Sequence, residues 1–225
     1  MARAPVNPPR PPSPIPIPTP IYRIVHIDNL PTLLARDALH APNHVPPDGL
    51  PWVSIHATQT QADRGQKVVA CGPRGIILDY VGFYFGPRSP MLFRIHTGHG
   101  VAQIDQSNIA YLVSTAQAVK ATGLGFVFYN GHSLAAYSRA FADLDRLADV
   151  DWATVNLVYW NDTPEDMDRQ RRKQAEFLVH RSMPWRLVKR IGVLNGAADA
   201  RVAAVLAAHP TRHQPLVSVE ISWYY

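Results

Sequence analysis

The chain has only one cysteine, Cys71, among its 225 residues. An internal disulfide is therefore excluded, and a reducing compartment such as the cytoplasm is the expected location. The sequence lacks an apolar run of about 18 residues, which argues against a transmembrane helix and a membrane partner. The first residues contain no apolar segment followed by a small-residue cleavage site, so they do not resemble a secretory signal.

The common nucleotide and metal motifs are absent as well. The sequence contains no GxxxxGK[ST], no GxGxxG and no cysteine cluster, so P-loop, Rossmann and zinc-thiolate interpretations lack support. His96 and His99, in HTGHG, are spaced as metal ligands can be. Because no carboxylate or third histidine lies near them in the sequence, we favour an exposed loop there and expect no metal.

The composition is that of a globular protein, with 47% hydrophobic and 17% charged residues. The net charge of +5 and the pI near 9.5 favour polyanionic partners such as nucleic acids, because each neutralised phosphate releases counterions. A slightly basic protein with no such partner is the alternative.

The first 20 residues contain nine of the 21 prolines. Proline fixes φ and removes backbone donors, so we expect a disordered leader over residues 1–19 and a folded domain over residues 20–225. The leader is either a partner-binding arm or a dispensable extension.

The folded part shows a mixed α+β pattern without the regular spacing of a doubly wound sheet. Residues 57–75 are polar and contain glycines, which predicts a long loop of the kind that is often functional. We expect strands at 21–26, 109–113, 126–129, 175–179, 190–194 and 216–221, and helices over 28–39, 114–122, 134–147, 151–158 and 198–208.

Glu176 is the most informative acidic residue. It follows the basic run Arg169–Lys173 and begins an apolar strand, where a carboxylate would be partly desolvated and costly unless paired. It could stabilise positive charge developing on a substrate, or it could form a surface salt bridge. The basic run, which includes Arg171 and Arg172, is either a phosphate clamp or a solvated helix face.

Other side chains carry two interpretations each. Arg64, in the polar segment, is a possible ligand for an anion or a carbonyl group, or simply a solvated charge. Tyr80 and Tyr84 lie in an aromatic segment interrupted by glycine. They either pack in the core or stack on a base or nicotinamide ring.

Four segments taken together resemble the DarT family, bacterial toxins that ADP-ribosylate bases in single-stranded DNA. They are IYRIVHIDNL at 21–30, DYVGFYFGPRSPML at 79–92, KQAEFLV at 173–179 and the terminal WYY at 223–225. The resemblance implies an α+β ADP-ribosyltransferase fold, in which two small, roughly orthogonal sheets with flanking helices form a cleft for NAD.

The resemblance also implies roles for particular residues. Glu176 falls at the catalytic glutamate and Arg64 at the catalytic arginine. Arg23, His26, Asn29 and Arg64 are expected to contact NAD. Two departures are visible: Tyr22-Arg23 stands where Tyr-His is common, and Gly82 replaces a usual proline.

The implied chemistry is the breaking of the nicotinamide–ribose bond, which creates an oxocarbenium-like centre that a carboxylate stabilises. A guanidinium stays protonated and cannot be the base. We therefore assign Arg64 to stabilising the deprotonating acceptor, and Glu176 to the ribose and to final proton acceptance. Candidate DNA contacts are Tyr80 and Tyr84 for stacking and, for phosphates or base edges, Arg88, Arg94, Arg171 and Arg172.

The function implied is that of a monomeric cytoplasmic toxin that transfers ADP-ribose from NAD to thymine in single-stranded DNA, sequence-specifically and reversibly. A macrodomain antitoxin would be its partner. The alternatives are guanine, RNA or protein as the acceptor, or an inactive nucleic-acid-binding relative, for which Arg23 is the main argument.

Overall fold

The computed structural model describes residues 13–210 and 213–225. Residues 1–12 of the predicted leader lie outside the described residues. Thr19, at the predicted boundary, is fully buried. Its amide donates to the side chain of Gln117 at 2.8 Å, and its carbonyl accepts from the amide of Ala116 at 2.9 Å. The chain is thus anchored to helix α4 (Ala116–Ala121) immediately before the first strand.

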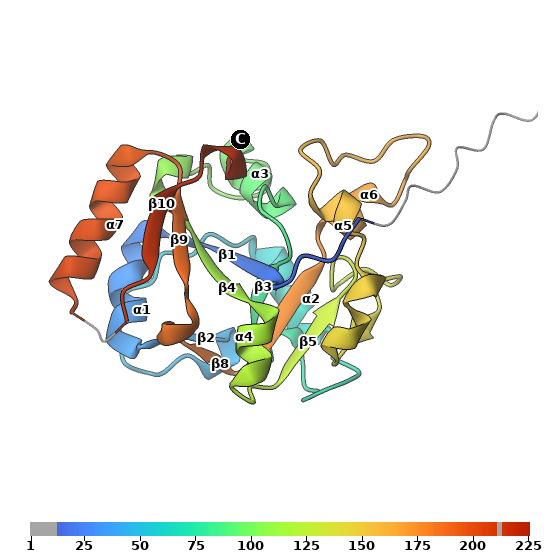
Figure 1. Cartoon of the computed structure of the whole chain (residues 1–225), viewed down its shortest axis with the longest axis horizontal. Helices are drawn as coiled ribbons and strands as arrows, with labels where there is room; N and C mark the ends of the chain where they lie inside the picture. The colour runs from blue at the N-terminus through green and yellow to red at the C-terminus, as the bar shows by residue number, and fades with distance from the viewer. Residues whose placement is uncertain (1–12, 211–212) are drawn as a thin grey trace, which may run out of the picture.

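The described strands form two sheets (Figure 1). The large sheet has the order β10-β9-β4-β1-β3-β7-β5-β6, and β2 pairs with β8 in the small sheet. The strands are β1 (Pro20–His26), β2 (Ala38–His40), β3 (Tyr80–Tyr84), β4 (Ile109–Thr115), β5 (Phe126–Tyr129), β6 (Ala140–Phe141), β7 (Glu176–His180), β8 (Ser182–Pro184), β9 (Arg190–Val193) and β10 (Leu216–Val219).

The large sheet consists of two four-stranded halves that meet at one position. Strand β1 pairs with β4 along its whole length, and β3 does the same with β7. Between β1 and β3, by contrast, the register within the described residues contains the single pair Tyr22↔Tyr84. The two strands therefore separate away from this pair, and the opening between them is available for a ligand.

The helices are α1 (Leu30–Arg36), α2 (Thr58–Gln66), α3 (Pro90–Thr97), α4, α5 (Trp152–Val155), α6 (Arg169–Lys173) and α7 (Gly196–Ala208). Helices α1 and α7 lie side by side at one end of the molecule (Figure 1). Among the described residues, no helix combines the length and apolar character needed to cross a bilayer.

Several predicted boundaries were wrong. Helix α1 follows Asn29 as expected but ends at Arg36 rather than Leu39, because Asp37 adopts a left-handed φ of 49° and the next residues form β2. The region 134–147 is not a helix, since it contains β6 and the start of a 3-10 turn over Leu144–Asp149. Within 151–158, only α5 is helical.

Residues 57–75 are not a continuous loop, because Thr58–Gln66 form α2. None of the nine residues of α2 is buried, so the sequence lacks the apolar periodicity by which a helix is usually recognised. The helix packs on the 3-10 turn Ile77–Asp79, where Gly65 allows the side chain of Leu78 to approach closely.

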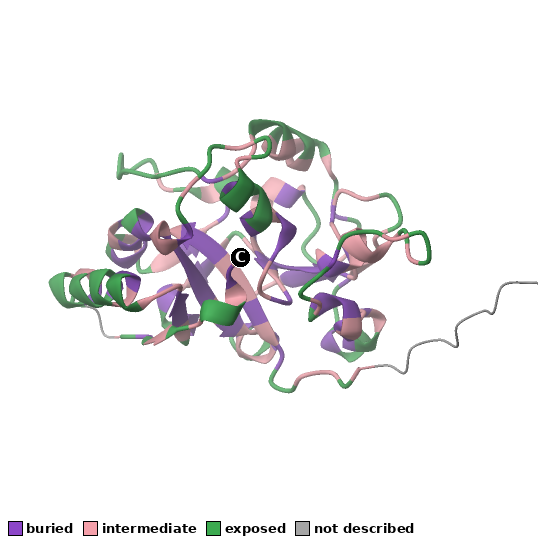
Figure 2. Cartoon of the chain, turned by 90° about the horizontal axis from the view of Figure 1, so that it is seen from above, coloured by how far each residue is buried: buried purple, intermediate pink, exposed green. Residues whose placement is uncertain are grey.

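The core lies along the large sheet. Figure 2 shows long buried stretches along its central strands and many exposed residues on the helices. Phe83, Phe128 and Phe177 come from neighbouring strands of one half-sheet and are almost completely buried. Strand β7 is buried over Glu176–Val179, so its first residue is a carboxylate fixed at the edge of a rigid apolar core.

Candidate active site

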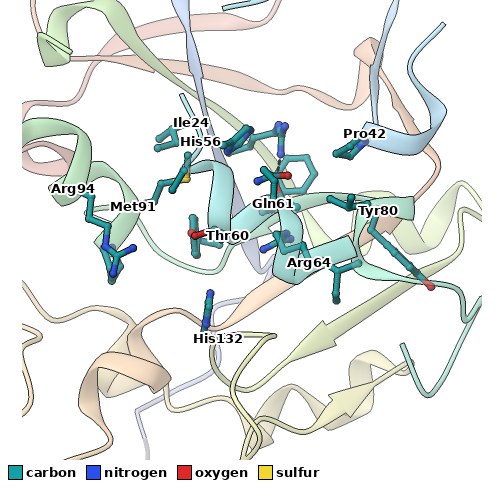
Figure 3. Close-up of a pocket in the computed structure, with 18 of the residues that line it drawn as sticks. Ile24, Pro42, His56, Thr60, Gln61, Arg64, Tyr80, Met91, Arg94 and His132 are labelled. Carbon is teal, nitrogen blue, oxygen red and sulfur yellow. Dashed lines mark hydrogen bonds between the residues drawn. The ribbon is translucent and has the colours of Figure 1, made fainter. Parts of the chain in front are cut away.

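A cleft of about 1030 Å³, its open mouth included, occupies the opening between β1 and β3. Helix α2 borders it with Arg64, and Figure 3 shows side chains from several elements around it. The lining residues include Arg23 and Ile24 from β1, Tyr80, Gly82, Phe83 and Tyr84 from β3, Thr60, Gln61 and Arg64 from α2, Met91 and Arg94 from α3, and His56 and His132 from connecting segments.

Glu176 is held at one side of the cleft by three hydrogen bonds. Arg64 Nη1 donates to Glu176 Oε2 at 3.0 Å, and the amide and hydroxyl of Ser133 donate to Oε1 at 3.0 and 2.9 Å. The Glu176 side chain is 3% exposed and that of Arg64 is 15% exposed. Arg64 lines the cleft, whereas Glu176 is absent from its described lining, so Arg64 is the member of this ion pair that borders the cavity.

Glu176 is ionised despite its burial. Burial alone would raise the pKa of this carboxyl group, but the charge of Arg64, the nearby His132 and the donors of Ser133 hold its pKa below the ordinary value. The site therefore contains a fixed negative charge in a poorly hydrated place, where its field is stronger than it would be in water.

The fold explains why residues 112 positions apart meet here. Glu176 pairs across the sheet with Tyr84 on β3 and with Tyr129 on β5, which fixes it next to the junction of the two half-sheets. Arg64 reaches it over Gly82, where an added Cβ would lie only 3.2 Å from Arg64 Nη2. The glycine that departs from the family pattern thus leaves room for the arginine.

Arg23 spans the opening between the two half-sheets. Its Nη1 donates to the carbonyl of Gly82 at 2.8 Å. Burial, together with the charge of Arg64, lowers its pKa to about 10, so it remains a cation at neutral pH. The described lining of the cleft contains three arginines, Arg23, Arg64 and Arg94, and no carboxylate. Such a cleft favours a ligand with anionic groups, as the pyrophosphate of a dinucleotide provides.

Sequence reasoning missed two histidines of the cleft, His56 and His132. Burial and the charges of Arg23 and Arg64 lower the pKa of His56 to about 4. His132 Nε2 lies 4.0 Å from Glu176 Oε1. For His132, the sequence offered one signal: residues 130–133 (Asn-Gly-His-Ser) form a polar turn directly after the strand predicted at 126–129.

The side chains of His26 and Asn29 form hydrogen bonds with nearby backbone groups. His26 Nδ1 accepts from the amide of Asp28 at 3.2 Å. Asn29 Nδ2 donates to the carbonyl of Val53 at 2.8 Å, and its Oδ1 accepts from the amide of Val53 at 2.7 Å. Neither side chain belongs to the described lining of the cleft. Asn29 fixes the loop that leads to His56, and direct contact of either residue with NAD stays a prediction.

Of the predicted DNA contacts, Tyr84 and Arg94 line the cleft. Tyr80 also borders it but is only 2% exposed, and its hydroxyl donates to the carbonyl of Arg74 at 2.5 Å. Little of the Tyr80 ring is therefore free to stack on a base.

Arg88, Arg171 and Arg172 are engaged within the protein. Arg88 donates to the carbonyl of Tyr224 and lies 4.4 Å from the ring centre of Tyr225. Each of the other two bonds to acidic side chains: Arg171 to Asp168, and Arg172 to Asp151 and Asp166. These bonds give all three a structural role, and their contact with DNA stays a prediction.

The metal alternative gains no support from the fold. Within residues 13–210 and 213–225, no group of three or more histidine, cysteine or acidic side chains is arranged to hold a metal ion. His96 lies in the exposed last turn of α3, where its Nδ1 contacts the side-chain amide of Gln106 at 3.1 Å.

Comparison with known proteins decides the family. The sequence model of the family described as "ssDNA thymidine ADP-ribosyltransferase, DarT" matches residues 22–225. The chain belongs to the DarT family. It is similar to a DNA ADP-ribosyl transferase of Thermus sp. (strain 2.9), with 41% identity over 210 residues that cover 93% of this chain and 98% of that protein.

Solved structures of DarT from Thermus sp. 2.9 agree with this assignment. The complex with ADP-ribosylated single-stranded DNA is 40% identical, with a TM-score of 0.89, and the match covers 95% of this chain and all of that one. The complex with NAD+ is also 40% identical, with a TM-score of 0.84 and coverage of 93% and 99%. The predicted DarT resemblance and the α+β ADP-ribosyltransferase fold are confirmed, and the family places this chain among NAD-dependent DNA ADP-ribosyltransferases.

Proposed function

We propose that this chain transfers ADP-ribose from NAD to thymidine in single-stranded DNA, and that the cleft between β1 and β3 is its catalytic site. The observation that carries the proposal is the ionised Glu176, held by Arg64 and Ser133 beside a cleft lined with arginines. The complexes of the Thermus sp. 2.9 protein with NAD+ and with ADP-ribosylated DNA support the same pair of substrates.

The cleft suits the donor in charge and in shape. Arg23 provides a fixed cation for the pyrophosphate, and Ile24, Phe83 and Met91 add apolar surface for the rings. When nicotinamide leaves, positive charge develops on the ribose carbon. A carboxylate preorganised beside it, as Glu176 is, lowers the barrier electrostatically.

Arg64 couples the donor to the acceptor. Its guanidinium bonds to Glu176 Oε2 and also lines the cleft, so it lies next to both the carboxylate and a bound acceptor. From there its charge would stabilise an acceptor ring nitrogen that is losing its proton.

Single-stranded DNA is the form in which the reacting base edge is accessible, since a duplex buries it in base pairing. Tyr84 and Arg94 line the cleft and are our first candidates for contacts with the base and the phosphates. The wider biological features remain proposals that rest on the family: a sequence-specific, reversible modification, a toxin role, a macrodomain antitoxin, a monomeric state and a cytoplasmic location.

The experiment that tests the proposed function uses isotope-labelled NAD with separate pools of single-stranded DNA, RNA and protein. The proposal predicts label on DNA oligonucleotides that contain thymine and none on thymine-free oligonucleotides. Label confined to RNA or protein, or to guanine, would contradict it in favour of the corresponding alternative. DNA binding without consumption of NAD would indicate an inactive relative.

A further inference from the structure

His132 faces the cleft from a rigid turn. Its side chain is 27% exposed, and Figure 3 shows it opposite the side chains of α2 and α3. Its amide donates to the carbonyl of Arg171 at 2.9 Å, and its carbonyl accepts from Ala135 at 3.0 Å. The preceding Gly131 packs so tightly that an added Cβ would lie 2.3 Å from Arg171 Nη1. The backbone that carries the imidazole is therefore held in a defined position.

The same turn holds the catalytic carboxylate. Ser133, the next residue, donates two hydrogen bonds to Glu176 Oε1, and His132 Nε2 lies 4.0 Å from that oxygen. The distance is too long for a hydrogen bond but short enough for strong electrostatic coupling. His132 and Glu176 thus form one unit in which the imidazole is the member that reaches the cavity.

Transfer to a ring nitrogen requires a group that takes its proton, and the other charged groups of the site are unsuited to this. The family resemblance assigned final proton acceptance to Glu176, but this carboxylate is buried, accepts three hydrogen bonds and has a lowered pKa, which makes it a weak base. Arg64 and Arg94 offer guanidinium groups, which donate hydrogen bonds and accept none. His56 lies beside Arg23 and Arg64, which oppose a positive charge on its ring.

His132 has the environment that a base needs. Burial and the charges of Arg64 and Arg94 lower its pKa, although Glu176 opposes them, so the imidazole is neutral at pH 7 and can accept a proton. The carboxylate of Glu176 then stabilises the imidazolium that forms.

We propose that His132 is the general base of the transfer, an inference that rests on the proposed function. The bond from the ribose carbon to nicotinamide breaks, and its electron pair leaves with neutral nicotinamide. The thymine ring nitrogen forms the new bond to that carbon, and its proton passes to His132 Nε2 and then to solvent. No oxidant, reductant or further reactant is needed.

The test compares wild type with His132→Gln and His132→Ala in single-turnover transfer to a thymine oligonucleotide. His209→Gln, at the C-terminal cap of α7 and outside the described lining of the cleft, is the matched control. We expect the two His132 variants to lose about 10² to 10⁴-fold in rate, with NAD affinity and melting temperature close to wild type. Added imidazole should partly restore His132→Ala. The wild-type rate should fall at acid pH as His132 becomes protonated, and this limb should disappear in His132→Gln.

Transfer by His132→Gln within about threefold of wild type would overturn the inference while leaving the proposed function intact. A loss that imidazole does not restore, with the acid limb unchanged, would also overturn it, because it would show a structural role. A wild-type chain that leaves DNA unmodified would overturn the proposed function, and the inference with it.

Discussion

Replacing Glu176 by glutamine removes the negative charge of the site while keeping the volume and shape of the side chain. The glutamine oxygen can still accept from the amide and hydroxyl of Ser133, which now bond to Oε1. The glutamine amide group, however, would face Arg64 Nη1, so that two donors meet where an ion pair stood. The substitution therefore separates charge from packing.

Two effects of different size follow. The loss of a preorganised group facing developing charge typically costs about 10²- to 10³-fold in rate. Leaving Arg64 without its acceptor costs about 1–3 kcal/mol of unfolding free energy. We expect the lower part of that range, because the Arg64 side chain is 15% exposed and can turn toward solvent in the cleft.

The assay combines single-turnover ADP-ribose transfer with urea denaturation of the same preparations. Glu220→Gln is the matched control, since Glu220 pairs with Arg190 at 2.9 Å next to strands β9 and β10 and does not line the cleft in the described structure. We expect Glu220→Gln to retain wild-type transfer and to lose less than about 1 kcal/mol. Wild-type transfer by Glu176→Gln, or an equal loss in both variants, would refute the reasoning.

The remaining predictions concern stability, access and charge. The difference in unfolding free energy between wild type and Glu176→Gln should be constant above pH 4.5 and shrink as pH falls below it. The reason is that the folded-state pKa of this carboxyl group is lowered from its ordinary value of 4.5. A difference that stays constant down to pH 2 in denaturation experiments would contradict this. Asn29→Ala removes both bonds to Val53 and should raise KM for NAD more than it lowers kcat, and steady-state kinetics with an unchanged KM would argue against the loop's role. Lys173→Met deprives three backbone carbonyls of their shared donor. It should destabilise the fold by at least about 2 kcal/mol in thermal or urea unfolding, and a variant as stable as wild type would contradict this. Arg94→Met should reduce the slope of log affinity for single-stranded DNA against log salt by about 1, as measured by fluorescence anisotropy. Arg88→Met, which loses internal bonds, should lower the melting temperature and leave that slope unchanged. The reverse pattern would assign Arg88 to the DNA.

The parts of the fold that sequence predicted are those with a strong local signal. Strand β1, strand β5 and helix α7 carry continuous apolar runs or an alanine-rich pattern, and each lies where it was expected. Helix α2 was missed because none of its residues is buried, so it has no apolar face that the sequence could show. The helix predicted over 134–147 was wrong because Ala140–Phe141 join the edge of the large sheet as β6 and a 3-10 turn begins at Leu144.

The site divides in the same way. The resemblance implied catalytic roles for Arg64 and Glu176, and the structure brings the two together as an ion pair. His56, His132 and Ser133 had no signature of their own, because their importance comes from where β5 and the loop after Asn29 deliver them. Arg88, Arg171 and Arg172 looked like a phosphate-binding set because the sequence does not show which carboxylates and carbonyls fold back onto them.

Mass spectrometry of a thymine-containing single-stranded oligonucleotide, incubated with NAD and either wild type or Glu176→Gln, tests the central claim most directly. The account predicts one ADP-ribose attached to a thymine with wild type and at least a hundredfold less adduct with the variant. Unmodified DNA with folded wild-type protein, or equal adduct with both, would contradict it.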